Sequence, residues 1–158
     1  MWVKICGIRD VATAEQIVSL KPDAVGLNFF AKSPRCVDRT VAAEISAMLP
    51  LEIEAVGLFV NHELNDVVDT AQQCGLRMIQ LHGDEPPEFL AELKGCSADV
   101  RILRAFRVDD SGLSEVADYL AECRKLDVCL AGCLIDARVD GEYGGTGHTA
   151  PWDLLADQ

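Results

Sequence analysis

The stretch Val3-Lys4-Ile5-Cys6-Gly7-Ile8-Arg9 sets the pattern that the rest of the chain repeats. Apolar residues alternate along its first half, which predicts a short strand with Lys4 and Cys6 on one face. Asp10 is a candidate N-cap for a helix from Val11 to Leu20. The chain therefore opens with one strand and one helix, and a thiol stands where the strand ends.

The same order of strand, loop and helix recurs along the sequence, with short connections and no low-complexity linker. Regular alternation predicts a parallel sheet with helices outside it, either doubly wound or curved into a barrel. We expect about six βα units in a single domain over residues 1–158, with Thr40 as the cap of the second helix. The later strands are expected at Ala24–Phe29, Ile53–Val60, Met78–Leu81, Val100–Phe106 and Val128–Ile135, and the later helices at Val41–Leu49, Glu63–Cys74, Pro86–Gly95, Leu113–Lys125 and, as a short one, Trp152–Leu155.

The composition is that of a soluble globular protein, with 49% hydrophobic and 25% charged residues. The formal net charge of -12 argues against nucleic acid as a partner, because binding to a phosphate backbone needs a basic surface. The same acidity disfavours anionic membranes. If the ligand is an anion, the positive charge that binds it must be local.

The seven cysteines are odd in number, are scattered and form no CxxC pair. This pattern is neither a disulfide framework nor a zinc site, and no metal ligand set is expected. Together with the absence of a basic-then-apolar leader, it predicts a protein of the reducing cytoplasm. The longest apolar run, Val128 to Ile135, is too short to span a membrane.

Polar or ionisable residues stand at or just past the expected C-terminal end of every strand. In a parallel barrel these positions converge on one mouth, where such folds place their chemistry. The alternative is that strand ends meet solvent and are polar for that reason alone. The residues concerned are Cys6, Asn28 with Arg35, Asn61, His82, Arg107 and Asp136.

Cys6 and Asp136 are the pair that could act as base and acid. A thiol acts as a base when a neighbouring cation or backbone N–H groups favour the thiolate, and Lys4 is a candidate for that cation. An aspartic acid can donate a proton from an apolar site, and the strand before Asp136 is apolar. The alternatives are a small buried hydrophobe for the cysteine and a turn or cap residue for the aspartate.

Other positions could bind a ligand. Arg35 lies in a loop that proline stiffens, and a planar guanidinium suits bidentate capture of a carboxylate, although a solvated arginine is the alternative. His82 could be a proton donor, a hydrogen-bond anchor or a loop residue packed against Gln80. Gly144 and Gly145 begin a glycine-rich run that offers backbone N–H groups to an anion, or that is simply a flexible loop.

These residues lie in stretches that resemble the phosphoribosylanthranilate isomerase family of tryptophan biosynthesis. The stretches follow the family's order along the whole chain, which is more specific than any single motif. They are Lys4-Ile5-Cys6-Gly7-Ile8, Asp23 to Gly26, Lys32-Ser33-Pro34-Arg35, Val56 to Asn61, Gln80 to Glu85, Leu134-Ile135-Asp136 and Gly144 to Gly147 before Trp152.

The resemblance implies a TIM barrel that catalyses an Amadori rearrangement, from N-(5-phosphoribosyl)anthranilate to 1-(2-carboxyphenylamino)-1-deoxyribulose 5-phosphate. Asp136 matches the family's acid, which protonates the furanose ring oxygen, and Cys6 matches the base, which removes the proton from C2 of the sugar. Arg35 matches the residue that holds the anthranilate carboxylate. The resemblance thus implies a small-molecule substrate, and neither a metal nor an organic cofactor.

The sequence departs from the family pattern in two places. Ala150-Pro151 stands where the family usually has Phe-Asp before the tryptophan. The chain also stops at Gln158, although an eight-stranded barrel needs two further βα units and the family builds its phosphate site after strands 7 and 8. We therefore expect an incomplete TIM barrel of about six βα units, as in a truncated product or a fragment.

Two other functions stay open at this point. The first is a non-catalytic partial barrel that dimerises or complements another chain, because six strands leave two open edges; a homodimer is thus one expected partner. The second is another α/β enzyme of sugar phosphates, which would not need Asp136 together with Cys6.

Overall fold

The computed structural model describes residues 1–109 and 112–137. Strands and helices alternate throughout this part of the chain. They are β1 (Lys4–Cys6), α1 (Val11–Ser19), β2 (Ala24–Asn28), α2 (Arg39–Met48), β3 (Glu54–Phe59), α3 (Leu64–Gln73), β4 (Met78–Leu81), α4 (Pro87–Cys96), β5 (Arg101–Val108), α5 (Ser114–Lys125) and β6 (Gly132–Ala137).

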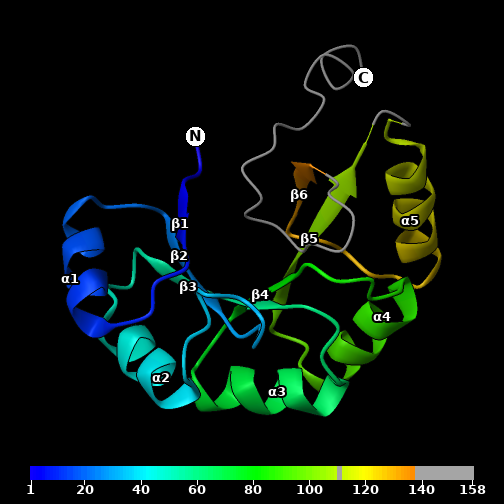
Figure 1. Cartoon of the computed structure of the whole chain (residues 1–158). Helices are drawn as coiled ribbons and strands as arrows, with labels where there is room; N and C mark the ends of the chain where they lie inside the picture. Colours follow the sequence, from blue (N-terminus) through cyan, green and yellow to red (C-terminus); the bar gives the residue numbers. More distant parts are fainter. Residues whose placement is uncertain (110–111, 138–158) are drawn as a thin grey trace.

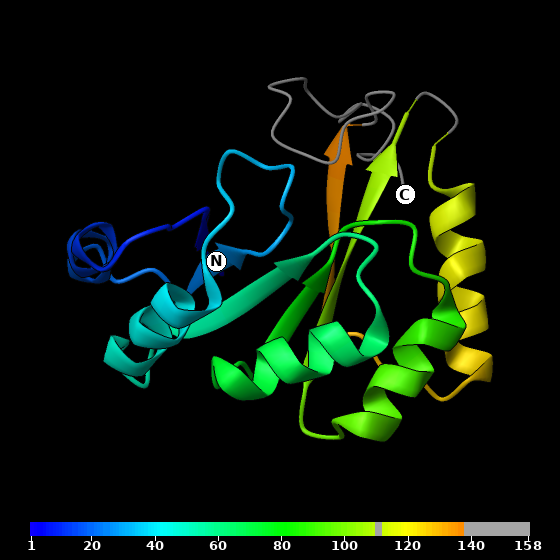
Figure 2. The same ribbon diagram turned by 60° about the horizontal axis from the view of Figure 1, so that its bottom comes forward.

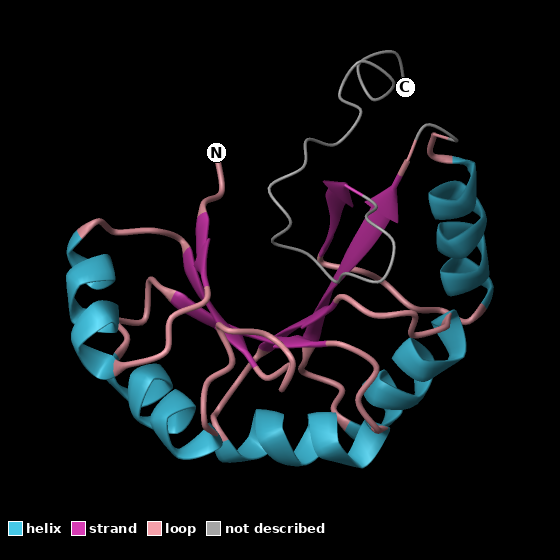
Figure 3. Ribbon diagram, viewed as in Figure 1, coloured by secondary structure: helices cyan, strands magenta, loops and turns pink. Residues whose placement is uncertain are grey.

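The six strands form one parallel sheet in which each strand pairs with the next along the chain, in the order β1 to β6. The sheet curves, and all the described helices lie along its convex side (Figures 1 and 3). Figure 2 shows the same arrangement from a second direction, with β5 and β6 side by side. The fold is therefore an incomplete TIM barrel, as predicted, and a doubly wound sheet is excluded because the helices cover only one face.

Alternate residues of the strands enter two separate apolar layers. Outward-pointing side chains such as Val25, Leu27 and Ile79 are fully buried against the helices, where most of the core lies. Inward-pointing side chains form a second, smaller cluster on the concave face. That cluster consists of Ala24, Val56, Met78 and Leu103. The polar ends of the strands lie beyond this inner layer.

The expected boundaries are correct for most elements. Asp10 caps α1, because its carboxylate accepts from the Thr13 backbone N–H at 2.8 Å. The cap of α2 was wrongly placed at Thr40. Asp38 is the N-cap and accepts from the Thr40 N–H at 2.7 Å, because a carboxylate two residues earlier reaches this free helix donor.

The last described strand also differs from its predicted range. Residues 128–131 are a connection: the Val128 N–H bonds to the Cys123 carbonyl at the end of α5, and pairing begins only at Gly132. The apolar residue types alone could not distinguish this connection, in which only Val128 is buried, from a strand. Strand β5 runs on to Val108, so Arg107 lies inside a strand and not beyond its end. The helix expected at Trp152–Leu155 lies outside the described residues.

Candidate active site

Cys6 ends the first strand on the concave face, with its side chain exposed. Its neighbour in the sheet is Gly26, and a Cβ atom at that position would lie only 2.6 Å from the Cys6 sulfur. The strand beside Cys6 therefore needs a glycine, because any larger residue would displace the thiol.

Arg35 reaches the same end of β1 from the loop after β2. Its aliphatic chain packs over Gly7, where a Cβ would approach the Arg35 Cδ to 2.7 Å, and Gly7 has a φ of +91°. Asn28 orders the loop: its amide donates to the Ser33 hydroxyl at 3.0 Å, and that hydroxyl accepts from the Arg35 backbone N–H at 3.1 Å. The arginine side chain is exposed. The structure thus places Arg35 beside the residue that follows Cys6.

A chain of polar contacts crosses the concave face from β1 to β6. The Lys4 ammonium donates to Oε1 of Gln80, and Nε2 of Gln80 lies 3.3 Å from Nδ1 of His82. Nε2 of His82 then lies 3.3 Å from Oδ2 of Asp136. We call Lys4, Gln80, His82 and Asp136 the concave chain. It spans the sheet between the two strands that carry Cys6 and Asp136.

Burial lowers the pKa of Lys4, while attraction and hydrogen bonding to the Cys6 thiol act in the opposite direction. The two side chains share a face of β1, as their alternation predicted. Lys4 thus contacts both the thiol and the amide of Gln80. The cation suggested by the sequence does lie beside Cys6.

His82 is 8% exposed, and burial lowers its pKa. The carboxylate of Asp136 opposes this shift, whereas the cationic Arg104, Lys4 and Arg107 add to it. The imidazole is therefore neutral at neutral pH. Nε2 is within ion-pair distance of Asp136 but has no well-aligned hydrogen-bond partner among the described residues. Leaving a buried donor in this state costs about 1–3 kcal/mol, which is typical of a functional position.

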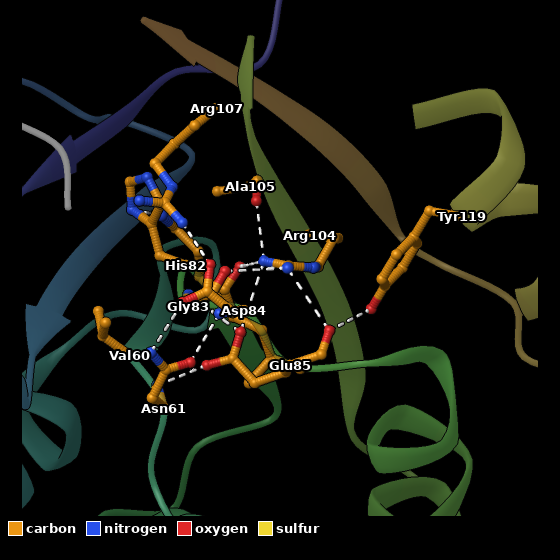
Figure 4. A network of polar contacts seen from close by, with 12 residues as sticks. Val60, Asn61, His82, Gly83, Asp84, Glu85, Arg104, Ala105, Arg107 and Tyr119 are labelled. Carbon is orange, nitrogen blue, oxygen red and sulfur yellow. Dashed lines mark hydrogen bonds and ion pairs between the residues drawn. The ribbon is translucent and has the colours of Figure 1, made fainter. Parts of the chain in front are cut away.

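Glu85 ties together the loops that follow β3 and β4 (Figure 4). Its two carboxylate oxygens accept from the backbone N–H groups of Asn61, at 2.7 Å, and Gly83, at 3.0 Å. Asn61, which has a φ of +53°, accepts from the Asp84 N–H at 2.6 Å through its side chain. Asn61 thus shapes the loop next to His82.

Arg104 holds the same loop from the helix-facing side of β5. Its guanidinium donates to the carbonyls of Leu81 at 3.0 Å, Ala105 at 2.8 Å and Gly83 at 3.0 Å, and lies 3.5 Å from Oε2 of Glu85. Both charged side chains are almost fully buried. We call Arg104 and Glu85 the buried clamp.

Aromatic rings close the buried clamp on its outer side. The guanidinium carbon of Arg104 lies 5.3 Å from the centre of the Phe106 ring and 5.2 Å from that of Tyr119. Burial raises the pKa of Tyr119 to about 12, and its hydroxyl donates to the Glu85 carbonyl at 2.9 Å. Sequence reasoning missed this network; the available signal was Arg104, a charged residue that alternation places on the same face of the strand as the apolar Ile102 and Phe106.

Two sets of predicted positions remain. Arg107 pairs with Asp84 at the mouth. Gly144 and Gly145 lie outside the described residues. No cluster of three or more metal-ligating side chains occurs in residues 1–109 and 112–137.

A cavity of about 550 Å³, lined by Trp2, Ile53, Glu54 and Arg101 among others, opens at the N-terminal ends of the strands, opposite the concave chain. None of the helices in the described ranges is long and apolar enough to cross a membrane.

Comparison with protein families gives a match to the model described as "N-(5'phosphoribosyl)anthranilate (PRA) isomerase" over residues 3–158. A relative of that name from Geobacter sulfurreducens is 44% identical over 156 residues, which are 98% of this chain and 70% of the relative. One from Geobacter metallireducens is 41% identical over 155 residues, again 98% and 70% of the two chains.

Solved structures give the same result. The phosphoribosyl anthranilate isomerase of Thermotoga maritima aligns with a TM-score of 0.79 at 33% identity, over 98% of this chain and 70% of that one. A further isomerase structure, in complex with reduced 1-(o-carboxyphenylamino)-1-deoxyribulose 5-phosphate, aligns with a TM-score of 0.71 at 30% identity, over 87% of this chain and 66% of that one. The chain thus spans about 70% of the length of the Geobacter relatives and of the Thermotoga maritima isomerase.

Proposed function

The chain belongs to the N-(5'-phosphoribosyl)anthranilate isomerase family, and we propose that its strand ends carry the acid, the base and the carboxylate-binding residue of that isomerisation. The observation that supports this assignment is the concave chain, which links the strand of Cys6 to Asp136 across one mouth. Ionisable groups of both kinds, proton-accepting and proton-donating, stand there together.

Asp136 acts as the acid in the first step. It donates a proton to the furanose ring oxygen of the substrate as the bond between C1 and that oxygen breaks, and the anthranilate nitrogen forms a double bond to C1. The products of this step are an open-chain protonated Schiff base and the Asp136 carboxylate. His82, whose Nε2 faces that carboxylate, stands ready to donate to it.

Cys6 acts as the base in the second step. As a thiolate it removes the proton from C2, the electron pair forms a double bond between C1 and C2, and the double bond to nitrogen is lost. The enolamine then takes a proton at C1 from solvent and releases the proton of its C2 hydroxyl to solvent, so that the C2–O bond becomes the carbonyl of the 2-ketone. The side chain of Lys4 lies beside the Cys6 sulfur and interacts with it. Acid and base each contribute about 10² to 10⁴ in rate.

Arg35 binds the anthranilate carboxylate through its planar guanidinium. Its aliphatic chain is held over Gly7, so the charged end projects from the same loop that borders Cys6. His82 contacts the opened sugar through the donor that Asp136 does not fully occupy. Gly144 and Gly145 remain proposed ligands of an anionic group of the substrate through their backbone N–H groups.

A turnover assay tests this function directly. Conversion of N-(5'-phosphoribosyl)anthranilate changes the fluorescence of the anthranilate moiety, and we expect the purified, folded chain to accelerate that change. Titration with the reduced product analogue should give saturable binding that Arg35→Met weakens. Folded protein that neither turns over the substrate nor binds the analogue would contradict the assignment.

A second candidate, a partial barrel that pairs with another chain, rests on the two edge strands. Among the described residues, β1 and β6 each pair on one side only. One similar isomerase, from Thermotoga maritima, is described as dimeric, and a homodimer is therefore the partner proposed here. Size-exclusion chromatography that gives a monomer at all concentrations would exclude this candidate.

The cytoplasm is the proposed location. All seven cysteines are free thiols, and four of them are exposed, which suits a reducing compartment. Cell fractionation would test this assignment.

A further inference from the structure

The orientation of the Gln80 amide follows from its contact with Lys4. A lysine side chain has N–H groups to donate and, as an ammonium, no lone pair to accept with. The atom of Gln80 that faces Lys4 is therefore the carbonyl oxygen Oε1. The NH₂ group is then turned the other way, toward His82.

The amide in turn decides which nitrogen of His82 carries the proton. An NH₂ group only donates, so Nδ1 of His82, 3.3 Å away, must present its lone pair. A neutral imidazole has one proton, which then resides on Nε2. Nε2 is the buried atom that faces Oδ2 of Asp136 at 3.3 Å. Lys4 and Gln80 thus each donate in the direction of β6, and the Nε2–H group of His82 faces Asp136 without a well-aligned hydrogen bond.

We propose that Gln80 is a positioning residue, which holds His82 as the Nε2–H tautomer so that an N–H group, and never a lone pair, faces Asp136. The proposal rests on the proposed function in one respect, that Asp136 is the acid of the reaction. Gln80 itself touches no reacting atom and acts only through His82.

This arrangement favours a single direction of proton transfer. When Asp136 has given its proton to the substrate, its carboxylate meets a donor and is stabilised. If His82 presented a lone pair instead, it would compete with the substrate for the Asp136 proton. The groups facing His82 are Asp136 from β6, Arg104 and Arg107 from β5 and Lys4 from β1.

A nuclear magnetic resonance measurement on ¹⁵N-histidine-labelled protein tests the tautomer without any need for activity. The spectrum at pH 8 should show His82, assigned with His82→Gln, with Nδ1 unprotonated and Nε2 protonated. Gln80→Glu places an acceptor against Nδ1, so we expect Nδ1 to become protonated in that variant. Persistence of an unprotonated Nδ1 in Gln80→Glu, or a protonated Nδ1 in the unaltered chain, would overturn the proposal.

Kinetics of the same variant test whether the tautomer matters to the reaction. Gln80→Glu should lower kcat on the order of 10–100-fold while KM changes little, since substrate binding does not need the tautomer. The matched control is Gln72→Glu on the exposed side of α3, which should leave kcat unchanged. An altered tautomer with unaltered kcat would refute the positioning role. Lack of turnover by the unaltered chain would instead refute the proposed function, and the spectrum would still decide the tautomer.

Discussion

Two polar networks meet at the end of β4, and they differ in how they are enclosed. The buried clamp of Arg104 and Glu85 is sealed between β5, α5 and the β4–α4 loop, with side chains only 6% and 3% exposed. The concave chain ends at Asp136, whose side chain is 31% exposed, and contains a buried donor on His82 without a well-aligned acceptor. Sealed, multiply bonded charges stabilise a loop, whereas an open chain with an unused donor can act on a ligand.

The largest effect is expected from Asp136→Asn, at the open end of the concave chain. An amide cannot supply the proton that opens the sugar ring, so kcat/KM should fall by about 10² to 10⁴. The free energy of unfolding should change by less than about 1 kcal/mol, because Asp136 is partly solvated. Fluorescence turnover and urea unfolding measure the two quantities. Asp69→Asn, on the exposed side of α3, is the control for both.

Removing the charge from the buried clamp should lower the free energy of unfolding strongly, whereas Asp136→Asn should mainly lower kcat/KM. Arg104→Met leaves the Glu85 carboxylate buried without its cation and removes the donors of three carbonyls. We expect the free energy of unfolding to fall by about 3–5 kcal/mol. Urea denaturation is the measurement, and any loss of activity should follow the loss of folded protein.

Arg101→Met is the matched control for that variant. Arg101 lies on the same strand and pairs with Glu54, but its side chain is 56% exposed. Its replacement should change the free energy of unfolding by about 0–1 kcal/mol. Equal effects from the two arginines would show that the clamp has no special role.

Gly7→Ala should disturb the mouth through Arg35. A Cβ at Gly7 would lie 2.7 Å from the Arg35 side chain, and the positive φ disfavours alanine by about 1–2 kcal/mol. We expect a modest loss of stability, together with a rise in KM as the guanidinium moves. Gly95→Ala is a control of opposite sign: this helical glycine has open space around it, and alanine should stabilise α4 by about 0.5–1 kcal/mol.

The smallest expected effect is the dependence of stability on pH through His82. Its pKa is lowered in the folded state, so the unfolded chain binds the proton more tightly. The contribution of the neutral imidazole to the free energy of unfolding is fully present above about pH 6.5, and it is lost as the pH falls toward the lowered pKa. The slope is at most about 1.4 kcal/mol per pH unit. His82→Gln should flatten this part of the curve of unfolding free energy against pH; an unchanged slope would contradict it.

Much of the fold could be predicted from the sequence because each βα unit carries its own local signals. Asp10 and the run Ala24–Asn28 are examples, since the residue types alone predict a helix cap at the first and a buried parallel strand at the second. The predicted start of β6 was wrong because residues 128–131 are apolar but precede the first residue of the strand, Gly132. That distinction depends on tertiary contacts.

The site was predictable in its positions but not in its connections. Cys6, His82 and Asp136 stand at strand ends, which alternation and order along the chain reveal. Contact between His82 and Gln80, which are two positions apart, was one of the alternatives that the sequence offered. The contact of Lys4 with Gln80 joins residues 76 positions apart, and no local pattern encodes it. Arg104 remained hidden for a similar reason, because the carbonyls it binds come from a different loop.

The most direct test of the account compares turnover of N-(5'-phosphoribosyl)anthranilate by Cys6→Ser and Cys96→Ser. Both residues are exposed free thiols, but Cys6 lies at the mouth and Cys96 at the end of α4. We expect kcat/KM to fall by about 10² to 10⁴ in Cys6→Ser and to stay unchanged in Cys96→Ser. Unchanged turnover in Cys6→Ser would contradict it.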